Sequence, residues 1–177
     1  GVNRFEDLHT LIQCENPDKA LIFCNTKDDT FRVAQFLKQH DHSAEAINGD
    51  LAQKEREKVL GKMRGGNLRF LVATDIAARG IDISFLPCVI NFMLSESADS
   101  YIHRTGRTGR AGREGVALSL IAPNEIGMLY QLRKGRKLDL TQRSLPTHEE
   151  LFSMRKQKAL DEVLDGLDAS EDLDYGP

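Results

Sequence analysis

The sequence predicts an α/β fold, with an open, mostly parallel, twisted sheet and helices on both of its faces. Short apolar runs alternate with longer stretches in which apolar residues recur at helical spacing, which is typical of βαβ units. Several runs are almost continuously apolar, as expected for strands that are covered on both faces. Polar clusters follow these runs, as they do where α/β sheets bind ligands.

The elements follow in order along the chain. A helix over residues 5–12 opens the fold, and a second helix contains Val33, Phe36 and Leu37 at i, i+3 and i+4. Further helices are predicted over residues 53–64, 98–106 and 124–134. Strands are predicted over residues 20–23, 43–47, 69–73, 88–92 and 116–121, and a last short strand over residues 138–143.

The C-terminal segment has a different pattern. Thr147 followed by Glu150 forms a capping-box sequence, and an apolar stripe of helical period includes Leu160, Val163 and Leu164. This pattern predicts a C-terminal amphipathic helix over about residues 148–167, which either docks on its own domain or contacts a partner or a second copy. The expected domains are residues 1–145, a helical extension over 146–167 and an acidic, disordered tail over 168–177.

Composition sets limits on the class of protein. The 177 residues include 24 Lys and Arg against 27 Asp and Glu, a net charge of −3, and fit one soluble domain with an appendage. Without an apolar run long enough for a membrane span or a secretory leader, we expect an intracellular, cytoplasmic protein with no membrane partner. Three scattered cysteines predict reduced thiols and no metal site. His40 and His42 are expected in an exposed turn.

Residues 103–110, which read HRTGRTGR, favour phosphate binding. Arg107 and Arg110 are three residues apart, so a helical turn would place both on one face. A guanidinium group is a rigid fork of donors that matches phosphate oxygens. Glycines in this run are unfavourable in a helix, which indicates close approach of the backbone to its surroundings. The alternative is a glycine-rich loop with solvated arginines.

Four polar clusters follow predicted strands, at residues 25–26, 48–50, 74–82 and 94–103. The carboxyl ends of parallel strands share one edge of the sheet, where α/β proteins bind ligands. Asn25-Thr26 and Thr74-Asp75 could also simply cap helices. The segment ATDIAARGID, however, carries Asp82, which could accept hydrogen bonds from ribose hydroxyls or pair with an arginine.

Together these segments resemble the second RecA-like domain of DEAD-box RNA helicases, which belong to superfamily 2. The resemblance covers roughly residues 1–145 and rests on LIFCNT, on the QKER of residues 53–56, on ATDIAARGID and on HRTGRTGR, in matching order and spacing. Related families usually begin the last segment with Gln, so His103 favours the DEAD-box group.

The resemblance implies roles for matching residues. Arg107 and Arg110 would be arginine fingers that contact the γ-phosphate of ATP, and Asp82 would bind its ribose. Arg79 and His103 would couple two domains. The residues implied to contact the RNA backbone, with little base preference, are Thr26, Gly49, Arg56 and Thr74.

The sequence contains neither a Gly-x-x-x-x-Gly-Lys-Ser/Thr phosphate loop nor an Asp-Glu-Ala-Asp segment. The implied partner is therefore an N-terminal RecA-like domain of the same protein, which would hold most of the ATP with Mg²⁺. We expect the chain alone to be inactive as an ATP hydrolase. The alternatives are a non-catalytic nucleic-acid or protein-binding module and half of a DNA helicase.

Overall fold

The fold is described from a computed structural model, in which residues 3–81, 86–109, 114–136 and 138–171 are described. The chain divides into two compact units, Gly1–Thr141 and Gln142–Pro177. The elements of the first unit, in chain order, are α1 (Arg4–Glu15), β1 (Ala20–Phe23), α2 (Lys27–Gln39), β2 (Ala44–Ile47), α3 (Gln53–Arg64), β3 (Phe70–Ala73), α4 (Asp75–Ala78), β4 (Cys88–Asn91), α5 (Ala98–Thr105), β5 (Val116–Ser119), the 3₁₀ helix η1 (Pro123–Glu125) and α6 (Ile126–Arg136).

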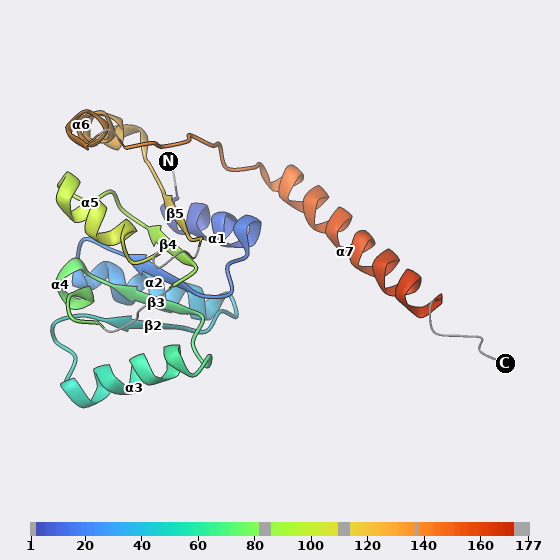
Figure 1. Cartoon of the computed structure of the whole chain (residues 1–177), viewed down its shortest axis with the longest axis horizontal. Coiled ribbons are helices and arrows are strands. Elements are labelled where there is room, and N and C mark those ends of the chain that lie inside the picture. The colour runs from blue at the N-terminus through green and yellow to red at the C-terminus, as the bar shows by residue number, and fades with distance from the viewer. Residues whose placement is uncertain (1–2, 82–85, 110–113, 137, 172–177) are drawn as a thin grey trace. The chain divides into compact units, whose positions relative to one another are not determined.

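The five described strands form one parallel sheet in the order β2-β3-β1-β4-β5 (Figure 1). Each central strand is buried along its whole length, whereas β5 at one edge is partly exposed. This agrees with the almost continuous apolar runs, because strands in the middle of a covered parallel sheet have no solvent face. The predicted fold class is confirmed.

The helices cover the two faces of this sheet. On one face, Leu60 and Met63 of α3 and Ala77 of α4 pack in a core with Phe23 and Leu71 of the strands. Side chains alternate along a strand, so the neighbouring residues point to the opposite face, where α2 contacts β2 and β3 and α1 contacts α2. The sheet is therefore a middle layer between two layers of helices.

The ends of α1 show how local sequence fixes a helix. The side chain of Asn3 accepts a hydrogen bond from the N–H of Phe5, and Asn16 ends the helix with a left-handed φ of 41°. Asparagine adopts this conformation more readily than most residues. The helix is longer than the predicted 5–12 because these caps lie outside the apolar stripe that the prediction used.

The predicted strand over residues 138–143 is wrong, since the structure describes these residues without regular secondary structure. Leu138 and Leu140 instead pack against a small cluster of Leu94, Tyr101 and Leu132. Their alternation buries two side chains as a strand would, but the segment has no described strand beside it to supply a hydrogen-bond ladder.

The second unit contains α7 (His148–Glu171). The predicted capping box is present: the Glu150 carboxylate accepts hydrogen bonds from the N–H and the hydroxyl of Thr147, whose oxygen accepts from the N–H of Glu150. The helix continues beyond residue 167 because adding a residue to a formed helix is easier than starting one. Residues 172–177 of the expected tail lie outside the described residues. In the described part of the chain, every helix is too short or too polar to span a membrane.

Candidate functional site

The parallel sheet brings the predicted polar clusters to one edge. Asn25, Asn48 and Thr74 come directly or almost directly after β1, β2 and β3, whose last residues lie in register with one another. The helices α4 and α5 lie beside each other at one end of the sheet (Figure 1). Segments far apart in the sequence therefore form one surface, as expected at the carboxyl edge of an α/β sheet.

A buried arginine, Arg104 of α5, joins three of these segments. Its Nε and Nη2 donate to the two carboxylate oxygens of Asp75 at 2.7 and 2.6 Å. Nη2 also donates to the amide oxygen of Asn25 at 2.8 Å, and Nη1 donates to the carbonyl of Met93 at 2.9 Å. The guanidinium carbon lies 5.2 Å from the centre of the Phe23 ring. Arg104 is only 1% exposed, so these contacts replace its hydration.

A pocket of about 270 Å³ lies beside this arginine. Arg79, His103 and Arg107, all of them predicted site residues, line it together with Gly80 and Ser100. Gly80 has a φ of +73°, which glycine adopts without strain and which turns the chain directly after Arg79. The structure thus brings together the two predicted coupling residues and one predicted arginine finger.

Arg107 is not held by a regular helix, because α5 ends at Thr105. The N–H of Arg107 instead bonds to the carbonyl of Arg104, three residues earlier, and Nη1 donates to the carbonyl of Ile81 at 3.4 Å. The expectation that a helical turn places Arg107 and Arg110 on one face stays a prediction, because it needs both side chains. Arg110 and Asp82 lie outside the described residues.

The glycines of this segment allow close packing. A Cβ atom on Gly115 would lie 2.5 Å from the backbone nitrogen of Gly109 and 1.9 Å from the hydroxyl of Thr108, so no side chain fits there. Gly109 itself has a φ of +67°. The expectation of close backbone approach is confirmed at this position.

The residues predicted to bind RNA lie at the same edge with different local roles. Thr26 caps α2 by accepting from the N–H of Asp29, and Thr74 caps α4 by accepting from the N–H of Ala77. Thr74 is buried, whereas Thr26 and Gly49 are exposed. The capping roles are confirmed for both threonines.

Lys27 and Asp50 connect two of these segments through a 2.5 Å ion pair beside Gly49. Arg56, at the start of α3, donates from Nη2 to the carbonyl oxygens of Ala77 and Arg79. The guanidinium group therefore contacts the backbone of the segment that presents Arg79 to the pocket. Arg56 is a link between the predicted RNA edge and the pocket.

His40 and His42 lie at a turn, as predicted, but both are half-buried rather than exposed. The ring of His40 lies 4.2 Å from that of Phe36 and 4.4 Å from that of His9, and His42 packs edge-on against Phe70. Burial, Arg69 and His40 lower the pKa of His42. Among the described residues, no three His, Cys, Asp or Glu side chains gather as a metal site.

The cysteines have structural rather than reactive surroundings. Cys24 and Cys88 are buried, whereas Cys14 is partly exposed. Burial raises the pKa of the Cys24 thiol well above its usual range and that of the Cys88 thiol to about 12. Both buried thiols therefore stay protonated near neutral pH.

Sequence reasoning missed the Arg104 and Asp75 pair. From the sequence, Asp75 is predicted only as part of a helix cap, and no role is predicted for Arg104. One signal is present: Tyr101 lies three residues before Arg104, so a helix carries both on one face. An arginine on the buried face of a helix indicates a buried partner.

Comparisons with known proteins agree with this architecture. The family model described as "Helicase conserved C-terminal domain" matches residues 3–112. The DEAD-box ATP-dependent RNA helicase CshA of Geobacillus kaustophilus is 37% identical over 172 residues, which is 97% of this chain and 37% of CshA. The chain thus spans little more than a third of that relative.

Solved structures give the same result. A DEAD box protein from Methanococcus jannaschii matches with 42% identity and a TM-score of 0.74, over 80% of this chain and 39% of that one. A variant of Dbp5 from S. cerevisiae bound to RNA and ADP BeF3 matches with 30% identity and a TM-score of 0.73, over 87% of this chain and 41% of that one. The chain belongs to the helicase C-terminal domain family, and its fold is similar to the corresponding part of DEAD-box proteins.

Proposed function

We propose that this chain completes the ATP site of an RNA helicase whose N-terminal RecA-like domain holds the nucleotide. The observation that carries the proposal is the pocket in which Arg79, His103 and Arg107 meet at the carboxyl edge of the sheet. Arg110 and Asp82 complete the proposed set, as the second arginine finger and the ribose ligand. A related protein has been solved with RNA and ADP BeF3, which supports a site for both ligands.

The residues present suit the phosphates of a nucleotide. Arg107 is half-buried, and the described residues give its guanidinium group one long hydrogen bond, to the carbonyl of Ile81 at 3.4 Å. Its other donors remain available for phosphate oxygens. ATP, when bound, supplies the phosphoryl bond that is hydrolysed, and Mg²⁺ would be held mainly by the N-terminal domain. Because the sequence holds no phosphate loop, the chain alone is proposed to be inactive.

The role of Arg107 is electrostatic. Charge spreads over the oxygens of the transferred phosphoryl group in the transition state, and a fixed guanidinium group stabilises it more strongly than it stabilises bound ATP. Arginine fingers that act from another domain contribute about 10³–10⁵ in rate. The Arg104 contacts fix the end of α5, from which the Arg107 backbone continues by a hydrogen bond to Arg104.

RNA is proposed to bind along the other part of the edge, at Thr26, Gly49, Arg56 and Thr74. Backbone N–H groups at the start of α2 and the exposed Gly49 suit sugar-phosphate contacts. Arg56 would act on both sites, because it donates to the carbonyls of Ala77 and Arg79 while its Nε and Nη1 remain for RNA phosphates. Binding of RNA would thereby hold Arg79 in place beside the nucleotide.

The test uses the protein with a matching N-terminal helicase domain joined to this chain. Arg107→Ala is expected to lower RNA-stimulated ATP hydrolysis by about 10³-fold or more, with far-UV circular dichroism unchanged. Arg64→Ala is the matched control, because Arg64 is exposed on α3 and pairs only loosely with Glu57 at 3.8 Å. Full activity of Arg107→Ala would disprove the finger role. Equal stimulation by RNA and single-stranded DNA would favour the DNA helicase alternative.

A further inference from the structure

One side of α6 carries exposed apolar, aromatic and basic side chains. Ile126, Tyr130, Arg133 and Lys134 recur at i, i+4, i+7 and i+8, which is the spacing of one face of a helix. Ile126 is 47% exposed and Tyr130 is 67% exposed, and both basic residues are exposed. These four residues form the α6 stripe.

The opposite side of α6 holds the helix on the domain. Leu132 is 4% exposed and lies in a cluster with Leu94 and Tyr101, against which Leu129 also packs. The apolar face that this helix needs for folding is therefore already used. The described residues give the ring of Tyr130 no aromatic contact and its hydroxyl no hydrogen bond. The ring is therefore available to a ligand.

The charge of α6 favours a polyanion. The helix contains three basic residues and no Asp or Glu, whereas the whole chain has a net charge of −3. Glu125, directly before the helix, is paired with Arg4 at 2.6 Å. The described residues give Arg133 and Lys134 neither an ion pair nor a hydrogen bond. Both cations are therefore available to phosphate groups.

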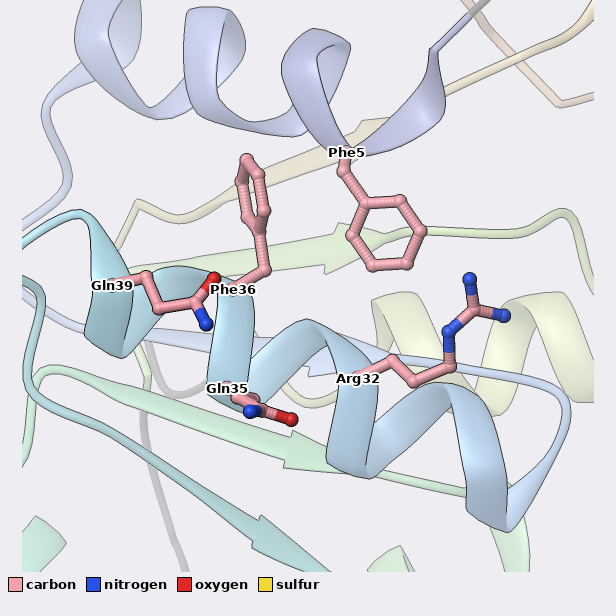
Figure 2. Close-up of a pocket in the computed structure, with 5 residues that line it drawn as sticks. All are labelled: Phe5, Arg32, Gln35, Phe36 and Gln39. Carbon is pink, nitrogen blue, oxygen red and sulfur yellow. The ribbon is translucent and has the colours of Figure 1, made fainter.

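The exposed rings between α1 and α2 have different surroundings. Figure 2 shows Arg32 on the same side of that groove as Phe5. Arg32 pairs with Asp28 at 3.9 Å, however, and Glu6 and Asp7 lie in the first turn of α1. These acids oppose a polyanion. The α6 stripe instead combines an exposed ring with unpaired cations, as surfaces that bind single strands of nucleic acid do.

Two contacts connect α6 to the proposed RNA edge. The side-chain amide of Asn25, next to Thr26, donates to the carbonyl of Leu94 at 3.1 Å. Leu94 in turn packs with Leu132 of α6. The helix that carries the stripe is therefore held close to the loop that begins α2, so a long strand can contact both surfaces.

We propose that the α6 stripe is a second contact site for single-stranded RNA, beside the edge at Thr26 and Arg56. A base would stack on the ring of Tyr130, and neighbouring phosphates would contact Arg133 and Lys134. The site would have little base preference, because every base has a stacking face and phosphates carry no sequence. The inference rests on the proposed binding of RNA by this chain. A membrane is disfavoured, because the buried apolar face of α6 cannot also insert into lipid.

The test measures binding of the whole chain to a fluorescent oligouridylate of about 20 nucleotides by fluorescence anisotropy. Tyr130→Ala should raise the Kd about 5- to 150-fold, as for the loss of one stacked base. Tyr130→Phe should bind as wild type does, because the ring remains. Arg133→Gln combined with Lys134→Gln should make the slope of log K against log salt less negative by about 1.4, at about 0.7 for each phosphate of a single strand.

Lys38→Gln combined with Arg64→Gln is the matched control, because it removes the same charge from the last turns of α2 and α3. It should leave the slope unchanged. An unchanged Kd for Tyr130→Ala, or an equal change of slope in the control, overturns the inference.

Arg56→Ala separates this inference from the proposed function. Loss of affinity in Arg56→Ala but not in Tyr130→Ala overturns only the stripe, and absence of RNA binding by wild type overturns both proposals. If changes in the stripe weaken binding of poly-glutamate or of vesicles that contain phosphatidylserine, but not of RNA, the stripe binds an acidic protein or a membrane, and the inference is also overturned.

Discussion

Replacing the buried Arg104 by methionine should strongly destabilise the domain. The change leaves the Asp75 carboxylate, the Asn25 amide oxygen and the Met93 carbonyl without their donor. Asp75 retains some access to water, since its side chain is 32% exposed, whereas Arg104 is 1% exposed. Removing one partner of a buried ion pair costs about 3–5 kcal/mol.

This cost should be visible as a shift in thermal and chemical unfolding. A domain of this size loses about 2–4 °C of Tm for each kcal/mol, so Arg104→Met should lower the Tm by about 6–20 °C. Urea unfolding followed by near-UV circular dichroism gives the free energy, because the buried Tyr101 lies on the same helix. Asp75→Asn should also be strongly destabilising, because it leaves the charge of the 1% exposed Arg104 without a counter-charge and replaces one of the two accepting oxygens by a donor.

The double variant measures the interaction energy between Arg104 and Asp75, apart from their contacts with other residues. If the pair is coupled as the geometry indicates, Arg104→Met combined with Asp75→Asn should cost less than the sum of the two single changes. Arg64→Met is the control and should change stability by less than about 1 kcal/mol, as for exposed pairs. A loss below about 1 kcal/mol for Arg104→Met would refute the reasoning.

Three further predictions concern pH and association. Burial raises the pKa of Glu125, but its hydrogen bonds, led by that from Arg4, outweigh burial and hold the pKa below its usual 4.5. The free energy of unfolding should therefore decrease as the pH falls below 4.5. In urea titrations, this decrease should be smaller for Glu125→Gln. Because the pKa of His42 is lowered in the folded protein, the unfolded chain binds a proton at this residue more tightly than the folded chain does. Acidification below pH 6.5 should therefore lower the free energy of unfolding. The loss should be smaller for His42→Gln. Leu160 and Val163 are exposed on α7, so the chain should self-associate. Sedimentation velocity should show a smaller species for Leu160→Glu than for wild type. A single wild-type species at all concentrations would contradict self-association.

The sheet was predictable from the sequence because its signal is local. The runs of β1 and β3 are apolar over their whole length, and helices between them leave a parallel arrangement as the simplest solution. The strand predicted over residues 138–143 is wrong because a local signal does not show whether a neighbouring strand is present. Alternating apolar residues also suit an irregular segment that buries Leu138 and Leu140 against a small cluster.

The site was predictable only in part. Its place followed from the polar residues after each strand, because parallel strands carry their carboxyl ends to one edge. The different positions of Arg104 and Arg107 could not be predicted, because every arginine has the same charge and the same hydrogen-bond donors. Both arginines border the pocket, but Arg104 is buried on α5 whereas Arg107 is half-buried beyond the end of that helix at Thr105. The end of a helix is among the least certain features of a sequence.

The contacts of Arg56 depend on the order of the strands, which the sequence alone does not show. It precedes Ala77 by 21 residues, and sequence alone gives it only a place at the start of a helix. Because β2 and β3 are neighbours in register, the helix that follows β2 begins beside the loop that follows β3. The guanidinium group therefore reaches the carbonyl oxygens of Ala77 and Arg79, so the proposed RNA contact at Arg56 would act on the backbone beside the proposed nucleotide pocket.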